Sequence, residues 1–198
     1  MSLQFRTLRQ VIQKNRRAAS VRFVSTHDLK HTKTKVVDNI AVITIDTPNA
    51  KVNSLGTEIM LEFDSILHKI KSDTSVQAAV LISGKPNCFI AGADISMLEN
   101  CKTEEDATRI ATIGQALLNE IETSSKPIVA AVQGSCLGGG LEVALSCHYR
   151  IGVNDKKTAL GESSASLDIT TSILKQKTFF ELKHPYRHTK EIYYSIKL

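Results

Sequence analysis

The sequence contains no tryptophan, and only 5% of its residues are aromatic. It also lacks a basic stripe beyond residue 27. Residues 1–27 hold six of the 25 basic residues and no acid. The formal net charge of +5 therefore belongs to this segment, and the remainder has 19 basic residues against 20 acidic ones. Nucleic-acid binders usually cluster Lys and Arg on one face. We therefore exclude nucleic acid as a partner.

Paired cysteines are absent as well. The four cysteines, Cys88, Cys101, Cys136 and Cys147, form no CxxC motif. This spacing argues against a disulfide framework and against a zinc site. We expect reduced thiols, with Cys136 and Cys147 in the core because their neighbours are apolar.

No stretch approaches the ~20 consecutive apolar residues of a membrane span, so we expect no transmembrane segment. Residues 1–27 are rich in Arg, free of acid, and apolar at helical spacing. These features predict a mitochondrial import leader, with a disordered basic tail as the alternative. The expected location is the mitochondrial matrix, or the matrix face of the inner membrane.

Strand-like and helix-like segments alternate between residues 36 and 153. Runs rich in apolar and β-branched residues predict strands at 36–46, 76–83, 127–132 and around 149–153. Helical periodicity predicts helices at 57–71, 104–122 and 141–148, the second with Ile110, Ile113, Leu117, Leu118 and Ile121 inward. This order predicts an α/β fold built from βαβ units on a mainly parallel sheet.

Two glycine-bearing loops each follow a buried strand and enter a helix. They are FIAGADI at 89–95 and QGSCLGGGLE at 133–142. Neither matches the glycine spacing of a phosphate-binding or dinucleotide-binding loop. Two such loops at adjacent strand ends can aim two backbone N–H groups at one developing oxyanion. The alternative is that the glycines only permit tight turns and close helix packing.

These loops, together with VITIDTPNAKVNSL at 42–55, resemble the enoyl-CoA hydratase (crotonase) family over residues 35–161. The resemblance implies a crotonase-like spiral of ββα units. It also implies hydration of 2,3-enoyl-CoA thioesters in mitochondrial fatty-acid β-oxidation. The oxyanion hole would be the N–H groups of Ala93 and Gly139, and Glu142 would be one of two catalytic carboxylates. The residues implied to border the CoA moiety are Ala50, Lys51, Val52, Ile90, Ala91, Gly92, Asp94 and Gly138.

The residue types suit this chemistry. Hydration needs a base that activates water and an acid that delivers a proton to carbon 2, and two carboxylates can divide these roles. No metal and no separate cofactor are expected, because coenzyme A is part of the acyl-CoA substrate. Judged without the motif, Glu142 would be an ordinary solvated helix acid.

The sequence departs from the family after Gly161. The family's second catalytic Glu follows the pattern LGxPE, where this chain has Leu160-Gly161-Glu162-Ser163-Ser164. Glu162 is the candidate second acid, although it comes two residues early, which moves a side chain ~6–7 Å along a strand. His184 and His188 in the tail have Pro185 between them, which disfavours the helix that a metal site would need.

We expect three segments: a leader and linker at 1–34, the N-terminal part of a crotonase domain at 35–161, and a divergent tail at 162–198. The domain would then be incomplete at its C-terminus. The alternatives to a working hydratase are a catalytically impaired, truncated form that binds acyl-CoA or partner subunits, and an isomerase or thioesterase using the same oxyanion hole. For the complete protein, resemblance to trifunctional fatty-acid oxidation α subunits implies a thiolase (beta) subunit as partner.

Overall fold

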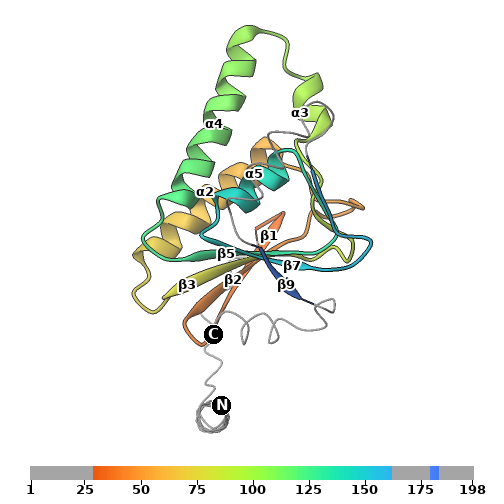
Figure 1. Ribbon diagram of the computed structural model, residues 1–198. Helices are drawn as coiled ribbons and strands as arrows, with labels where there is room; N and C mark the ends of the chain where they lie inside the picture. Colours follow the sequence, from red (N-terminus) through yellow and green to blue (C-terminus); the bar gives the residue numbers. More distant parts are fainter. Residues whose placement is uncertain (1–28, 162–178, 183–198) are drawn as a thin grey trace, which may run out of the picture.

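The computed structural model describes residues 29–161 and 179–182. The predicted leader, Glu162 and most of the predicted tail lie outside these residues. Within them, the chain forms a large sheet whose one face carries the helices α2, α4 and α5 (Figure 1). The predicted α/β class is confirmed.

The large sheet contains six strands in the order β1-β2-β3-β5-β7-β9. Only the pair β1–β2 is antiparallel, and the other neighbouring pairs are parallel. The strand bounds are β1 Thr32–Val37, β2 Ile40–Ile45, β3 Ala78–Ser83, β5 Ile128–Val132, β7 Tyr149–Val153 and β9 Phe179–Leu182.

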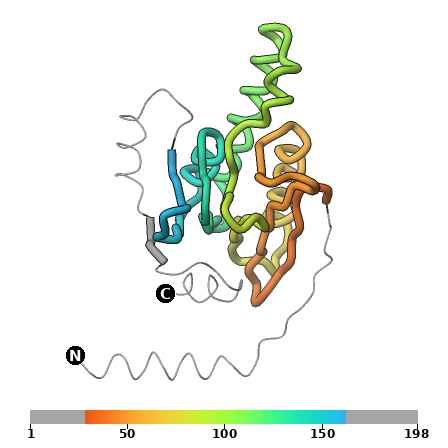
Figure 2. The backbone as a smooth tube through the Cα atoms, turned by 90° about the vertical axis from the view of Figure 1, so that its right-hand side faces the viewer, coloured from red at the N-terminus to blue at the C-terminus, as the bar shows by residue number. Residues whose placement is uncertain are grey.

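A second, smaller sheet of three parallel strands has the order β4-β6-β8. Each of its strands follows a strand of the large sheet, and the bounds are β4 Cys88–Ile90, β6 Ser135–Leu137 and β8 Ala159–Gly161. A helix follows β4 and another follows β6, so two strands and a helix repeat along the chain. Figure 2 shows successive turns of this spiral lying side by side, from orange to blue. The expected spiral of ββα units is confirmed.

The three helices predicted with bounds begin and end within two residues of their predicted positions, whereas α3 had no predicted bounds. Helix α2 spans Thr57–Ser72 and buries one face, made of Ile59, Met60, Phe63, Ile66, Leu67 and Ile70. Helix α4 spans Glu104–Glu122 and starts at a capping box formed by Thr103 and Asp106. The short helices are α3, Ile95–Glu99, and α5, Gly139–Ser146.

Helix α4 is less buried than predicted. Of the five residues expected to face inward, only Leu117 and Ile121 are buried, and the other three are half-buried. The reason is visible in Figure 1, where the N-terminal half of α4 extends beyond the sheet. Ile110 and Ile113 border a cavity between the helices, and Ile113 also packs against the edge of the core.

The predicted single strand at 36–46 is a hairpin instead. Asp38 and Asn39 have φ angles of 48° and 68°, and they connect β1 to β2. Positive φ at both central residues is the signature of the type I′ turn, which fits the twist of a two-residue hairpin.

The predicted burial of Cys136 and Cys147 is confirmed, with exposed fractions of 0% and 2%. Cys88 is buried as well, and all four cysteines are free thiols. Burial raises the pKa of the Cys88 and Cys136 thiols, so both stay protonated and inert at neutral pH.

Candidate active site

The two glycine-bearing loops meet at one end of the small sheet. Strand β4 precedes the first loop and pairs with β6, which precedes the second. Leu55 forms a bridge to Ala93: its N–H donates to the Gly92 carbonyl at 2.8 Å, and its carbonyl accepts from the Asp94 N–H at 3.0 Å. In a parallel bridge of this kind, the N–H and C=O of Ala93 itself point away from Leu55.

Glycine allows the two loops to touch through their backbones. A Cβ on Gly140 would lie 2.3 Å from the carbonyl oxygen of Ile90, and a Cβ on Gly92 would lie 3.4 Å from the carbonyl oxygen of Leu137. Gly92 also has a φ of 110°, and Gly138, which precedes α5, has a φ of 49°. Larger residues here would separate the loops or strain the backbone.

The backbone N–H groups of Ala93 and Gly139 are available for a ligand. Ala93 is exposed, and Gly139 is the first residue of α5. Within residues 29–161 and 179–182, neither amide donates a hydrogen bond. The first N–H groups of a helix have no partner inside it and carry its positive dipole end. Both groups can therefore donate to an acceptor brought by a ligand.

Glu142 lies in the first turn of α5 and is exposed. Its Oε2 is 3.8 Å from the position that a Cβ on Gly139 would occupy, so the carboxylate lies beside the start of the helix. The structure thus brings Glu142 close to Gly139. The other predicted acid, Glu162, lies outside the described residues.

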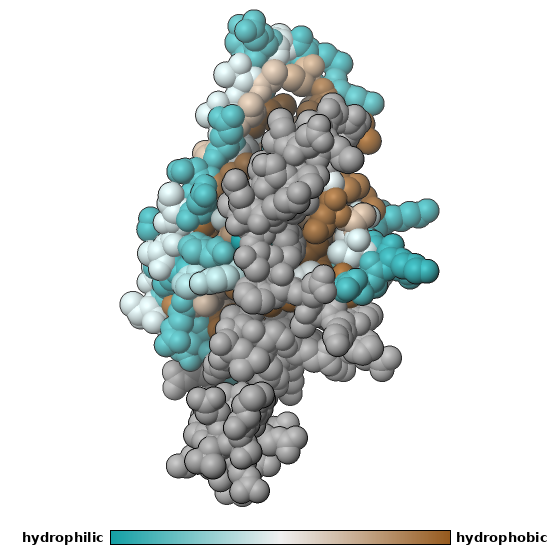
Figure 3. Space-filling model, in the orientation of Figure 1, coloured by the Kyte–Doolittle hydropathy of each residue, from teal (hydrophilic) through white to brown (hydrophobic). Residues whose placement is uncertain are grey.

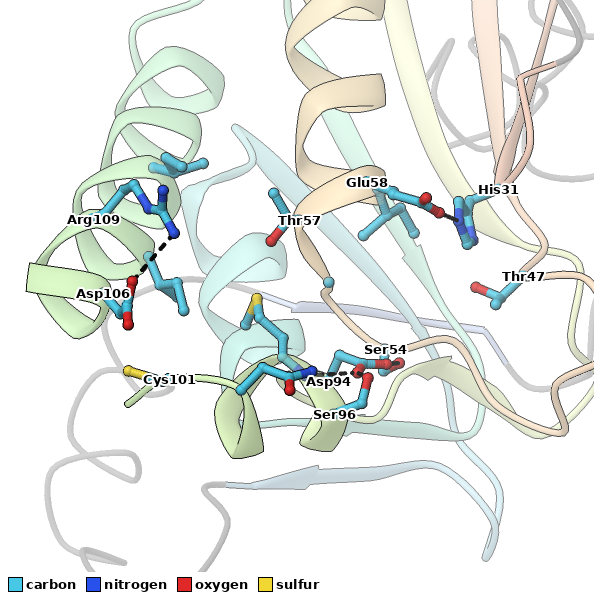
Figure 4. Close-up of a pocket in the computed structure, with 16 residues that line it drawn as sticks. His31, Thr47, Ser54, Thr57, Glu58, Asp94, Ser96, Cys101, Asp106 and Arg109 are labelled. Atoms are coloured by element: carbon cyan, nitrogen blue, oxygen red, sulfur yellow. Dashed lines mark hydrogen bonds and ion pairs between the residues drawn. The ribbon is translucent and has the colours of Figure 1, made fainter. Parts of the chain in front are cut away.

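A cavity of about 540 Å³ lies between α2, α3 and α4 (Figure 4). Ile59, Met97, Ile110 and Ile113 supply its apolar lining, and most of its other lining residues are polar or charged. Ser54 and Asp94 lie at one polar end, and Glu58, Asp106 and Arg109 also line the cavity. Ala93, Gly139 and Glu142 are not among its lining residues, although Asp94 adjoins Ala93 in sequence. A single space shared by both amides and Glu142 therefore stays a prediction. The sequence missed this cavity, because the same isoleucines were assigned to the core.

Asp94 is held in place at the polar end of the cavity. Its carboxylate accepts hydrogen bonds from the Ser96 hydroxyl and, at 2.8 Å, from the Ser54 hydroxyl. These two hydroxyls, Ser96 first, lower the pKa of Asp94, so it is ionised at neutral pH. Figure 4 shows the three side chains together, with the Asp106–Arg109 ion pair on the opposite wall.

The residues expected to border CoA differ in accessibility. Lys51 and Val52 are exposed and Ala50 is half-buried, so this segment can contact a ligand. In the other loop, Ala91 and Asp94 are half-buried, whereas Gly92 is buried. Gly138 is half-buried and donates its N–H to the Gly161 carbonyl. Ile90 is fully buried, so its side chain belongs to the core and only its backbone borders the loop.

Asn53 anchors both of these segments, a role that no local sequence pattern indicates. It is fully buried, and its side-chain amide donates to the Ile45 carbonyl, the Ser83 hydroxyl and the Phe89 carbonyl. Its side-chain oxygen accepts from the Thr47 N–H at 3.0 Å, and its backbone carbonyl accepts from the Ala91 N–H at 2.8 Å. One side chain therefore makes hydrogen bonds to β2, β3 and β4.

The surface near α3 is apolar. Ile95 is 71% exposed and Leu98 is 52% exposed. Figure 3 shows apolar atoms gathered in this region, beside the hydrophilic outer side of α4. In the part of the chain that the structure describes, no helix has the length and hydrophobicity to cross a membrane.

One group of side chains in residues 29–161 has the composition of a metal site. It consists of Asp64, His68 and Glu120, on α2 and α4, with His68 Nδ1 3.1 Å from Glu120 Oε1. Two of the three residues are exposed, and the contact of the His68 ring with the Glu120 carboxylate links α2 to α4. The expected absence of a metal in the reaction stays a prediction.

Comparison with known proteins gives concordant matches. Residues 35–175 match the family model described as enoyl-CoA hydratase/isomerase. The fatty acid oxidation complex subunit alpha of Shewanella baltica (strain OS185) is 48% identical over 132 residues, which are 67% of this chain and 19% of that protein. The same subunit of Idiomarina loihiensis is 46% identical over 132 residues, with the same two coverages. The chain thus spans only a small part of these relatives.

Solved structures agree with this assignment. An enoyl-CoA hydratase from Geobacillus kaustophilus HTA426 superposes with a TM-score of 0.62 at 27% identity, over 69% of this chain and 49% of that one. An enoyl-CoA hydratase/carnitine racemase from Magnetospirillum magneticum superposes with a TM-score of 0.63 at 21% identity, over 75% and 57%. The second likeness is one of fold alone.

The predicted mitochondrial location is wrong, both for the matrix and for the inner membrane. The relatives come from Shewanella and Idiomarina, which are bacteria, and this origin points to a cytoplasmic protein. Residues 1–28, whose composition suggested the leader, lie outside the described residues.

Proposed function

This chain belongs to the enoyl-CoA hydratase/isomerase family, and we propose that it binds 2,3-enoyl-CoA thioesters of fatty-acid β-oxidation and adds water to them. The observation that carries the proposal is the pair of backbone N–H groups, on Ala93 and Gly139, that have no partner among the described residues. They follow two hydrogen-bonded strands of the small sheet. Such a pair suits a thioester carbonyl whose oxygen becomes negative during the reaction.

In the proposed reaction, the thioester oxygen accepts hydrogen bonds from Ala93 N–H and Gly139 N–H. Glu142 orients a water molecule and takes its proton as the oxygen attacks carbon 3. Electron density moves through the enolate-like intermediate onto the thioester oxygen, where the two amides stabilise it. A second acid then delivers a proton to carbon 2, and Glu162 is the proposed donor. Coenzyme A takes no part beyond being the carrier of the acyl group.

The decisive assay is hydration of crotonyl-CoA by the purified chain and by Glu142→Gln. Loss of a positioned acid or base lowers a rate by about 10²-fold or more, so the variant should be slower by that factor. Glu105→Gln, an exposed helix glutamate on α4, is the matched control and should keep the parent rate. Turnover that survives unchanged in Glu142→Gln would refute the assignment.

A second candidate function is binding of acyl-CoA with little or no turnover. It is favoured by Ser164, which stands where the family pattern places the second catalytic Glu. Titration calorimetry with crotonyl-CoA distinguishes the two, because this candidate requires heat of binding without product.

For the complete protein, we propose a thiolase (beta) subunit as partner, since the relatives are named as alpha subunits of a complex.

The cavity between α2, α3 and α4 is the proposed site for the acyl chain. Four apolar side chains line it among polar ones, and Asp94 in its lining adjoins Ala93, which belongs to the proposed carbonyl site. Ile113→Trp should fill part of it and weaken binding of dodecanoyl-CoA about tenfold, since several buried methylenes lose contact. Butanoyl-CoA should lose much less affinity, because its four-carbon chain occupies less of the cavity than a twelve-carbon chain does.

The control for this variant is Ala111→Trp, which places the same side chain on an exposed position of the same helix. Calorimetric titration of both variants with both ligands tests the proposal. Equal losses of affinity for butanoyl-CoA and dodecanoyl-CoA would show that the acyl chain binds elsewhere.

A further inference from the structure

We propose that Arg150 is a positioning residue, which fixes the helix that carries Gly139 and Glu142; this inference rests on the proposed function. Arg150 lies on β7 and is only 4% exposed. Within the part of the chain that the structure describes, the Nη1 hydrogen bonds of its guanidinium do not go to Ala93, Gly139 or Glu142. Instead, they go to the opposite end of α5, the C-terminal end.

The guanidinium acts as a side-chain cap for α5. Arg150 Nη1 donates to the carbonyl oxygens of Ala144 at 3.3 Å, Leu145 at 3.2 Å and Cys147 at 2.6 Å. The last carbonyls of a helix have no partner within it, and they form the negative end of its dipole. A buried cation at this end therefore satisfies the carbonyls and balances the dipole.

The length of α5 makes this cap important for the site. The helix has eight residues, so it is ~12 Å long, and Glu142 lies about one turn from the cap. Its start is held by the contact of Gly140 with the Ile90 carbonyl, and its end by Arg150. His148, just after the helix, is also hydrogen-bonded to Ile128 of β5. Its backbone N–H donates to the Ile128 carbonyl, and its ring Nδ1 accepts from the Ile128 N–H. A small tilt of so short a helix displaces the Gly139 amide and the Glu142 carboxylate together.

The chain offers a matched control for this residue. Lys126 precedes β5 and donates to the carbonyls of Ile70 at 2.5 Å and Asp73 at 2.6 Å, at the C-terminal end of α2. It thus caps a helix in the same way. However, α2 carries none of the proposed oxyanion donors and none of the proposed catalytic acids. Loss of Lys126 should cost stability without disturbing α5.

The experiment compares Arg150→Met, Arg150→Lys and Lys126→Met in the full chain, by urea unfolding and by the kcat and KM for crotonyl-CoA. We expect Arg150→Met to lower kcat about tenfold with KM within about twofold, because the charge and the cap are lost together. Arg150→Lys should lose only about threefold, because one ammonium replaces part of the cap. Lys126→Met should unfold at lower urea and keep the parent kcat.

An unchanged kcat in folded Arg150→Met, or an equal loss in Lys126→Met, would overturn the inference. Should Arg150→Met fail to fold, Arg150→Lys carries the test, and parent-like kcat in that variant would overturn it.

If the parent chain itself shows no hydration, the proposed function fails. Hydrogen exchange at the amides of Val143 and Ala144 then decides on Arg150 separately. Exchange should be faster in the Arg150 variants than in Lys126→Met, and equal rates would overturn the inference.

Discussion

Gly140→Ala should unfold the protein at a much lower urea concentration than the parent. The new Cβ would lie 2.3 Å from the Ile90 carbonyl oxygen, 2.7 Å from its Cβ and 2.9 Å from its carbonyl carbon. These are mostly backbone atoms of a buried strand, which cannot rotate away as a side chain tip can. Overpacking typically costs about 1–3 kcal/mol, and we expect the upper end of this range or more. Urea unfolding followed by circular dichroism measures the loss.

Gly114→Ala is the control for this substitution. Gly114 lies in α4, and a Cβ there would meet no atom within 4 Å. Alanine is the better helix former by about 0.5–1 kcal/mol, so this variant should be slightly more stable than the parent. The same chemical change is thus expected to have opposite signs at two helical glycines. A loss of stability of similar size in both variants would contradict the proposed contact with Ile90.

Asn53→Asp should destabilise the protein strongly at neutral pH and much less in acid. The amide nitrogen donates to three oxygens, on Ile45, Ser83 and Phe89. A carboxylate oxygen in its place cannot donate, and burial facing carbonyl and hydroxyl oxygens disfavours its charge. The pKa of the new acid should therefore be higher in the folded state than its usual ~3.9.

The sign of the pH dependence follows from this raised pKa. Below pH ~4, the introduced carboxyl group is protonated in both states and can donate one of the lost hydrogen bonds. As the pH rises above that value, the unfolded chain releases its proton more readily, so stability falls until the folded-state pKa is passed. We expect a loss of about 3–5 kcal/mol at pH 7.

Urea unfolding of Asn53→Asp at pH 4 and pH 7, relative to the parent at each pH, measures this effect. The control is Asn119→Asp on the exposed side of α4, where the change should stay within about 0.5 kcal/mol. A loss in Asn53→Asp that is the same at both pH values would show that the missing donor, and not the buried charge, is responsible.

The helices were predictable, because their signals are local. Helices α2 and α4 each show apolar periodicity over about three turns, and Thr103 caps α4 with a side chain visible in the sequence. The hairpin at Asp38 and Asn39 was missed, because the apolar run resumes directly after it and no glycine marks the turn. Strands β4, β6 and β8 have only three residues each, which is too short to show a period of two.

The candidate site was predictable only in part. The glycine-bearing loops could be identified, since their composition signals close backbone approach. The roles of Asn53 and Arg150 could not, because each depends on how separate elements pack. Asn53 contacts β2, β3 and β4, and Arg150 reaches from a strand to the end of a helix in another layer. The cavity likewise depends on the separation of three helices, which no local pattern encodes.

The pairing of β4 with β6 has a consequence for how freely this family can vary. Adjacent strands are ~4.8 Å apart, and two N–H donors that share one oxygen at ~2.9 Å can be no more than about twice that distance apart. In the proposed oxyanion hole, the spacing of β4 and β6 would therefore favour a separation of the Ala93 and Gly139 N–H groups within this limit. Because both donors belong to the main chain, substitution of Ala93 leaves its N–H in place unless the new residue is proline. In the proposed function, the hydrogen bonds to the thioester oxygen can therefore be kept while the side chains around them vary.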